Sequence, residues 1–273
     1  ITDTNQQTDV FLRDLDVNIT VAVSRNSGGT ATGNLGSSSP VFNQDGRALV
    51  FVSIGTDLVA NDVNGKQDVF LWRLVDPGPG GTPQLPGTLP DQTIELVSVS
   101  AAGAGTGNGA SGHTASSVSD DLRYVAFFSD ASDLVDGNAD TNGVADVFIR
   151  DRTAGVTRLV SYHPVNNTLG NGASITPFLS ADGDVVVFAT DSTNLAANDL
   201  NSAADIVATA LTNNVPASLA LTATIFRPLE SPQGVEFPVT VQVANHGTSA
   251  VNNLRVANVG TGNLENVRLQ ASQ

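Results

Sequence analysis

The sequence of 273 residues contains no cysteine and no methionine, a single lysine (Lys66) and a single tryptophan (Trp72). Without cysteine there can be no disulfide, no thiolate metal site and no cysteine nucleophile. No apolar run approaches the about 20 residues of a membrane-spanning helix, so direct membrane insertion is not expected. Together with abundant Asn, Thr and Gly, these absences are typical of an exported chain, extracellular or at the cell surface, with the periplasm as the alternative. The chain starts at Ile1 in the middle of a repeat, which predicts a processed or partial product.

Positive charge is also scarce. The chain has 12 Lys and Arg against 27 Asp and Glu, a formal net charge of -15. Such a charge repels the phosphates of nucleic acids and anionic membranes, so nucleic acid is not an expected partner. Hydrophobic residues still make up 40% of the chain, enough for a sizeable core.

One phrase recurs along the chain: Asp-x-Asn-x-x-x-Asp followed by apolar residues. Its copies start at residues 3, 62, 140 and 199. The longer middle interval contains a Pro- and Gly-rich insertion, about residues 75–92, which is typical of a loop. A repeat of this length is typical of solenoids, propellers and arrays.

Each repeat contains four strand signals, two after the Asp-Asn phrase and two before the next one. Asp45-Gly46 and Asp182-Gly183 each separate two apolar runs, which predicts a tight hairpin with a type I′ turn. The middle copy has Asp121-Leu122 instead, so its hairpin is expected to turn differently.

The second strand of each hairpin is apolar at consecutive positions, as in residues 48–52, 124–128 and 185–189. A strand with one wet face would alternate polar and apolar residues, so these strands should be covered on both faces. Small antiparallel sheets stacked face to face around an axis, as in a propeller, give this pattern. A β-sandwich, which buries only one face of most strands, is the alternative.

The hairpin segments 39–47 and 177–183, each leading to an apolar strand and then to Asp-Val-Phe-Leu or a variant, resemble the blade motif of TolB-like propellers. The resemblance covers about residues 1–212 and implies a leading half blade and three further blades. These are too few for a closed ring, because closed propellers have about four to eight blades. The predicted fold class is therefore all-β, with antiparallel propeller blades in an incomplete ring that a neighbouring copy or further blades would complete.

From residue 213 to 273 the pattern changes to alternation, with Leu219, Leu221, Ala223 and Ile225 and then every second residue from Val235 to Val243. Alternation indicates strands with one buried face. Residues 241–250 are similar to the Ig-like adhesion-related repeats of bacterial surface proteins. The resemblance implies a partial Ig-like β-sandwich, truncated or completed by another chain, because the segment is shorter than the about 100 residues of a full sandwich.

The Asp-Asn phrase offers the best candidate metal site. A carboxylate, an amide oxygen and a second carboxylate at this spacing could converge on calcium, which takes six to eight oxygen ligands. Gly65 and Gly143 permit a sharp turn in two of the copies. The structural alternative is that the Asp and Asn side chains form Asx-turns within the loops. The predicted calcium ligands are Asp3, Asn5, Asp9, Asp62, Asn64, Asp68, Asp140, Asn142, Asp146, Asp199, Asn201 and Asp205.

No catalytic residues are predicted. The three histidines, His113, His163 and His246, occupy loop or turn positions that do not suggest a general base. Aromatic residues are only 5%, which disfavours a sugar-binding platform, although paired acids of a glycosidase are not ruled out by counting. Trp72 stands where other copies have Arg13 and Arg150, so it is expected to be a partly exposed packing residue between blades.

These features favour a non-catalytic extracellular structural or interaction module with calcium-stabilised loops. Its expected partner is another protein or copies of itself, in a homo-oligomer or filament. The alternatives are an accessory propeller region of a larger secreted hydrolase and a periplasmic TolB-like partner of an envelope complex.

Overall fold

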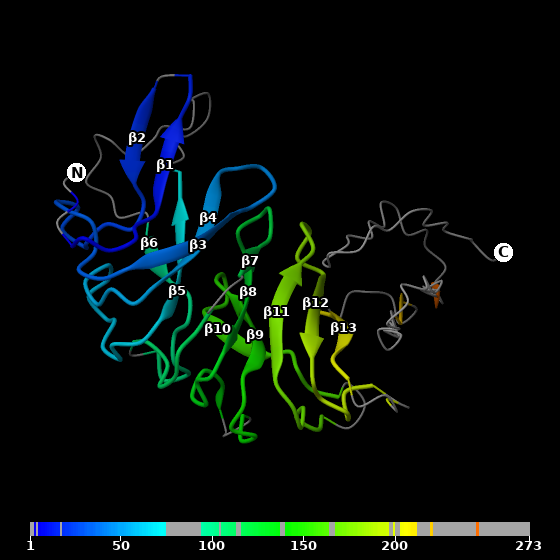
Figure 1. The fold of residues 1–273 in the computed structure, drawn as a ribbon. Helices are drawn as coiled ribbons and strands as arrows, with labels where there is room; N and C mark the ends of the chain where they lie inside the picture. Colours follow the sequence, from blue (N-terminus) through cyan, green and yellow to red (C-terminus); the bar gives the residue numbers. More distant parts are fainter. Residues whose placement is uncertain are drawn as a thin grey trace, which may run out of the picture.

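The computed structural model describes most of the repeat region and little beyond it. The described residues are 3, 5–16, 18–74, 94–103, 105–112, 116–136, 140–163, 167–196, 199, 203–211, 219–220 and 244–245. In this part of the chain every named element is a β-strand, and the sheets follow one another from the N-terminal side to the C-terminal side (Figure 1). No helix in the described ranges is long and apolar enough to cross a membrane.

The sheets are antiparallel and small. The first has two strands, β1 (Phe11–Asp14) and β2 (Ile19–Ala22). The second contains, in spatial order, β3 (Ser37–Phe42), β4 (Ala48–Ser53), β5 (Asp68–Arg73) and β6 (Ile94–Leu96). The third contains β7 (Ser117–Val118), β8 (Tyr124–Ser129), β9 (Asp146–Asp151) and β10 (Val156–Leu159). The fourth has β11 (Ser174–Leu179), β12 (Val185–Thr190) and β13 (Asp205–Ala210).

This architecture confirms the predicted fold class: all-β, with antiparallel four-stranded sheets compatible with propeller blades. β1, β5, β9 and β13 all follow a copy of the Asp-Asn phrase. By this correspondence β1 and β2 are the third and fourth strands of a blade, and β11 to β13 are the first three strands of another. Within the described residues, the two end sheets are therefore incomplete at opposite positions.

The central strands are dry on both faces, as consecutive apolar residues predict. Every residue of β4 and of β8 is buried. In β4, Leu49 and Phe51 pack towards the β1–β2 sheet, whereas Val50 and Val52 pack towards the β7–β10 sheet. Burying a Val, Leu or Phe side chain is worth about 1.5–3 kcal/mol, so the contacts between sheets are the main source of stability.

β12 differs because it lies in the last described sheet. Val186 and Phe188 are buried against the β7–β10 sheet, whereas Val185 and Val187 on the other face are only half-buried. The prediction that both faces of this strand are buried is therefore wrong for β12, because only one face is buried. No described sheet covers its second face.

Trp72 also differs from its prediction of partial exposure, because its exposed fraction is 0%. It pairs with Leu49 in β4 and Ile94 in β6, and it packs in the core between its own sheet and the β1–β2 sheet. The prediction of partial exposure relied on the arginines at the corresponding positions, Arg13 and Arg150, and it is wrong for Trp72.

The predicted type of hairpin turn is wrong, and the hairpins at residues 43–48 and 119–124 share one turn conformation. Only Gly46 of the Asp45-Gly46 pair has a positive φ (72°), so the turn is not type I′, which needs two such residues. The loop is longer and is closed where the backbone N–H of Asn43 donates to the carbonyl of Ala48. Leu122, expected to turn differently, has φ 60° and the same pattern of backbone hydrogen bonds.

Two predicted segments lie largely outside the described residues. One is the insertion at residues 75–92, and the other is the Ig-like segment from residue 213 onwards. Within the latter, β14 (Leu219–Ala220) pairs antiparallel with β15 (Ala244–Asn245).

Candidate functional site

The Asp-Asn loops between consecutive blades are the candidate site, because they place a carboxylate at the start of β1, β5, β9 and β13, buried in the β5 and β9 copies and half-buried in the other two. The last Asp of the loop is held in the same way in three copies. In the β5 copy, the Ser98 hydroxyl donates to Asp68 Oδ1 at 2.6 Å and accepts from the backbone N–H of Val69 at 3.0 Å. Ser161 with Asp146 and Ser24 with Asp9 repeat the arrangement.

In each copy the serine hydroxyl donates a hydrogen bond to Oδ1 of the Asp and makes none to Oδ2. Oδ2 of Asp9, Asp68 and Asp146 is buried and has no hydrogen-bond partner in the described part of the chain. Asp68 and Asp146 are fully buried, with exposed fractions of 0%. A buried carboxylate oxygen without a partner is costly, so these atoms are expected to take a proton, a cation or a buried water.

The first Asp of the loop joins the last one in two of the copies. Asp62 is 5% exposed, and neither of its carboxylate oxygens has a hydrogen-bond partner among the described residues. Its charge opposes ionisation of Asp68, and the charge of Asp146 opposes ionisation of Asp140. The structure therefore brings together Asp62 with Asp68 and Asp140 with Asp146.

Burial raises the pKa values of these carboxyl groups. The pKa of Asp62 rises to about 6 and that of Asp68 to about 7, in each case mainly because burial removes water from the charged form. The pKa of Asp140 rises to about 7 through burial and through the charge of Asp146. The pKa of Asp146 is also raised, again mainly by burial.

The Asn of the phrase has a structural role, as the Asx-turn alternative predicted. The Asn64 side-chain amide donates to the Gly107 carbonyl at 2.9 Å, and its oxygen accepts the Lys66 backbone N–H at 2.7 Å. Asn142 makes the same two contacts, with Gly170 and Val144, and Asn5 does so with Gly33 and Gln7. These side chains tie the loop to a segment 28 or 43 residues further along the chain.

Gly65 and Gly143 have φ values of 62° and 71°, which confirms that these positions need the left-handed turn. In the first copy Gln6 takes this conformation with φ 57°. There Asp3 is exposed, and its Oδ1 accepts the backbone N–H of Asn5. This copy lacks the buried pair.

In the fourth copy Asp199 and Asp205 are half-buried, and Asn201 lies outside the described residues. Throughout the described ranges, no group of three or more His, Cys, Asp or Glu side chains is placed to hold a metal. Of the histidines, His163 lies half-buried in a loop after β10, whereas His113 and His246 are not described.

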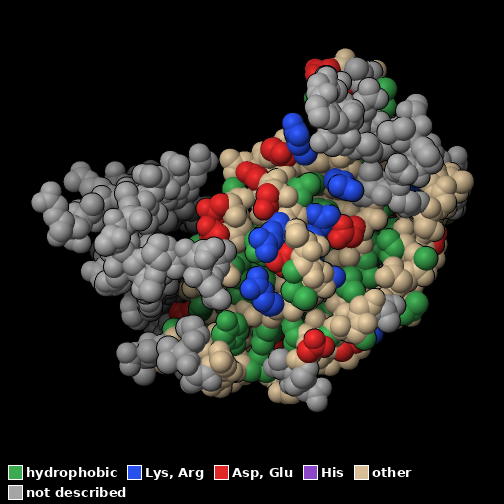
Figure 2. Space-filling model, turned by 180° about the vertical axis from the view of Figure 1, so that it is seen from behind, with side chains coloured by type: hydrophobic (Ala, Val, Ile, Leu, Met, Phe, Trp, Pro, Cys, Tyr) green, Lys and Arg blue, Asp and Glu red, His purple; other side chains and the backbone are tan. Residues whose placement is uncertain are grey.

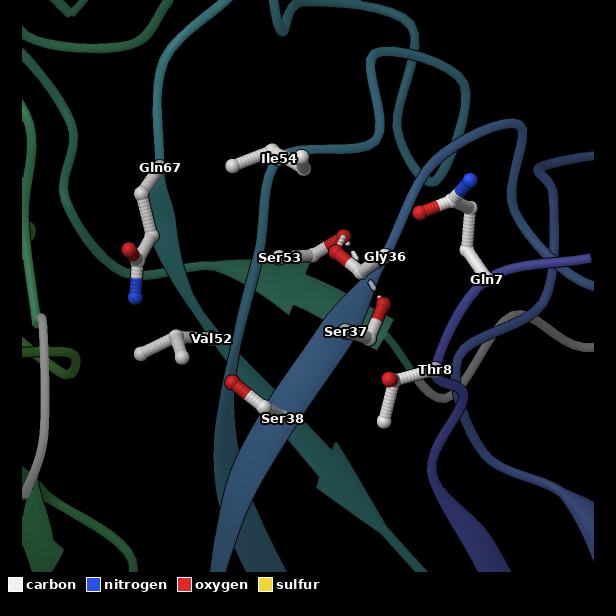
Figure 3. A pocket seen from close by; sticks show the side chains of 9 residues that line it. All are labelled: Gln7, Thr8, Gly36, Ser37, Ser38, Val52, Ser53, Ile54 and Gln67. Carbon is white, nitrogen blue, oxygen red and sulfur yellow. Dashed lines mark hydrogen bonds between the residues drawn. The ribbon is translucent and has the colours of Figure 1, made fainter.

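A separate cavity of about 250 Å³ opens between the segment before β1 and the β3–β5 strands. Gln7 and Gln67 lie on opposite sides of it, with Ser37 and Ser53 between them (Figure 3). The Ser37 hydroxyl donates to Ser53 Oγ at 2.8 Å. Ser111 with Ser129 and Ser174 with Thr190 form the same pair in the next two sheets, so these hydroxyls belong to the repeat rather than to a ligand site.

Charges on the surface are mixed. Figure 2 shows Lys and Arg side chains gathered on the rear face with Asp and Glu beside them and hydrophobic side chains between. Arg123 and Arg152 bridge neighbouring strands or sheets. Arg123 contacts Asp151 at 2.8 Å and lies 4.7 Å from the Tyr124 ring centre, and Arg152 contacts Glu95.

Comparison with known protein families finds no match, and no curated protein is similar to the chain. Among solved structures, the chain is similar to one titled "Crystal structure of the tricorn protease", with 14% identity and a TM-score of 0.35. The similarity covers 74% of this chain and 18% of that one. The chain thus spans less than a fifth of the length of that protein.

Proposed function

We propose that the chain is a non-catalytic structural or interaction module that works outside the cytoplasm and self-associates through the apolar surface left uncovered at the two ends of its row of sheets. The resemblance of residues 1–212 to TolB-like blades and of residues 241–250 to Ig-like adhesion-related repeats supports an extracellular or cell-surface location. The observation that carries the proposal is a difference in burial between equivalent positions of successive sheets.

Phe42 and Val118 both stand directly before the residue that begins the hairpin loop. Val118 is 6% exposed, because it packs against the complete β3–β6 sheet. Phe42 pairs with Leu49, on the face that looks towards β1 and β2, and it is 48% exposed. On this side the described residues supply only β1 and β2, in the positions of the third and fourth strands of a blade, and they leave Phe42 partly uncovered.

The β11–β13 sheet, at the other end of the array, also has exposed apolar side chains on one face. Phe178 pairs with Val187 and Ile175 pairs with Ala189, so both lie on the half-buried face of the β11–β13 sheet. Phe178 is 45% exposed and Ile175 is 41% exposed. An apolar sheet face of this kind is favourable to cover, and a second copy of the chain offers the complementary end.

Association of this kind is heterologous, because the two ends of the array differ. It forms a ring if the rotation between copies closes and a filament if it does not. Negative-stain electron microscopy of the associated species distinguishes discrete particles from fibres.

The test is the mass of the chain by light scattering over about a hundredfold range of concentration. We expect the mass to rise with concentration, because association follows mass action. Phe42→Ser and Phe178→Ser should each lower the associated fraction. Leu15→Ser is the matched control, because Leu15 is an exposed apolar residue (83%) in the β1–β2 turn and not on a strand face.

A monodisperse monomer at every concentration contradicts the proposal. So does an associated wild-type chain whose mass is unaffected by both Phe substitutions. In that case other strands or another protein cover these faces.

A further inference from the structure

Two of the four Asp-Asn loops contain a buried pair of carboxyl groups with at least one oxygen that has no hydrogen-bond partner among the described residues. We propose that the Asp62/Asp68 pair and the Asp140/Asp146 pair each bind one hard divalent cation, with calcium as the occupant. The proposal concerns the inside of the repeat, and it holds or fails independently of self-association.

The first argument is the number of oxygens that lack a partner. Asp62 contributes Oδ1 and Oδ2, and Asp68 contributes Oδ2, all buried and without a hydrogen-bond partner among the described residues. Asp62 does not take part in the serine arrangement that fixes Asp68. It lies in the same loop, and its exposed fraction is only 5%. Asp146 Oδ2 is in the same state in the second loop, beside Asp140, which is also 5% exposed.

The second argument is charge. Two ionised carboxylates in one buried loop carry a charge of about -2, which a divalent cation neutralises and a single lysine or arginine does not. Lys66 is the one basic residue in the 62–68 loop, and its Nζ donates to the carbonyl of Asn108 at 2.9 Å. The 140–146 loop contains no Lys or Arg.

The third argument is that the loops are shaped before any ion enters. Asn64 and Asn142 fix them by hydrogen bonds to the carbonyls of Gly107 and Gly170, which lie 43 and 28 residues further along the chain. Gly65 and Gly143 provide the left-handed turn between the two carboxylates. A loop that is already folded loses less entropy when it binds a ligand.

The ligand set is therefore smaller than the sequence predicted. Asn64 and Asn142 act as clamps, so the carboxylates supply the protein charge, and water or backbone carbonyls supply the remaining oxygens that calcium takes. The first copy does not qualify, because Asp3 is exposed and already accepts the Asn5 backbone N–H. Two sites are expected in place of four.

Calorimetric titration of the chelator-treated full chain with calcium at pH 7.5 tests the proposal. We expect about two calcium ions bound per chain and a melting temperature raised by about 5 °C in excess calcium. Magnesium, which gives up its water shell reluctantly, should bind more weakly. The isosteric double variant Asp62→Asn/Asp140→Asn should lose both the bound ions and the thermal shift.

Asp45→Asn is the matched control, because Asp45 is an exposed loop residue in the β3–β4 hairpin, and it should retain the calcium response. Absence of calcium binding and of any thermal shift in the wild-type chain overturns the proposal. So does a calcium response that survives unchanged in a folded double variant. Light scattering of the same samples separates this outcome from a failure of self-association.

Discussion

Arg152, which follows β9, holds Glu95 of β6 in a two-pronged ion pair that joins two neighbouring sheets. The Arg152 Nε lies 3.1 Å from each carboxylate oxygen of Glu95, and Nη2 lies 2.5 Å from Oε2. The third nitrogen, Nη1, donates to the backbone carbonyl of Leu122 in the β7–β8 turn. One side chain thus connects the β3–β6 sheet to two segments of the β7–β10 sheet.

We expect Arg152→Leu to lower the free energy of unfolding by about 1–2 kcal/mol, because it removes charge-assisted hydrogen bonds and leaves the Leu122 carbonyl without this donor. Chemical denaturation measures the change. Arg47→Leu is the control, because Arg47 is 59% exposed and lies 3.7 Å from the exposed Asp45, a geometry worth little. If the two variants lose the same free energy of unfolding, the ion pair between the sheets contributes no more to stability than an exposed surface pair.

A second prediction concerns the hairpin turn at Gly46, whose φ is 72° and around which there is open space. Gly46→Ala should destabilise the protein by about 1 kcal/mol, because an alanine is strained at positive φ. Gly28→Ala should be neutral or slightly stabilising, since Gly28 has an ordinary φ and its new Cβ meets only contacts of 3.7 Å or more. The comparison is made by thermal unfolding, and a harmless Gly46→Ala would contradict the role assigned to this turn.

The sheets could be predicted because their signal is repeated and local. Consecutive apolar residues in three copies indicate strands covered on both sides, and β4 and β8 are buried throughout. The conformation of Leu122 could not be predicted in this way, because leucine alone disfavours positive φ. Here the surrounding turn imposes it: Ser119 Oγ donates to Asp121 Oδ1 and accepts the Tyr124 N–H.

The candidate site was predictable only in part. Spacing along the chain places Asp62 and Asp68 in one loop, but it does not distinguish a ligand from a clamp. The role of Asn64 depends on the Gly107 carbonyl, which is 43 residues away in sequence. Likewise, Asp140 is 5% exposed and Asp3 is exposed, although both occupy the first position of the same phrase, so the phrase alone does not determine burial.

A third prediction addresses the serine that fixes the last Asp of the loop. Ser98→Ala should lower the free energy of unfolding by about 2 kcal/mol, because Asp68 Oδ1 and the Val69 N–H both lose a buried partner. Ser132→Ala is a suitable control, since the Ser132 hydroxyl accepts a hydrogen bond in an exposed loop. Indistinguishable denaturation curves for the two variants would refute this role of the serine.

The final prediction is the direction in which pH changes stability when no divalent cation is present. Burial raises the pKa of Asp62 to about 6 and that of Asp68 to about 7. In the unfolded chain the pKa of Asp is about 3.9. A carboxyl with a raised pKa in the folded state stabilises the fold fully below the unfolded pKa, and this contribution is lost as the pH rises through the folded pKa.

Chelator-treated protein should therefore be less stable at pH 8 than at pH 5, by about 2 kcal/mol or more. Asp62→Asn should flatten this dependence, because it removes one of the two charges that burial opposes, whereas Asp45→Asn should leave it unchanged. Urea denaturation at several pH values between 5 and 8 measures the slope for all three proteins. Stability that is constant or rises over this range in the wild-type chain would mean that the paired carboxylates are not as isolated from water and countercharge as their burial indicates.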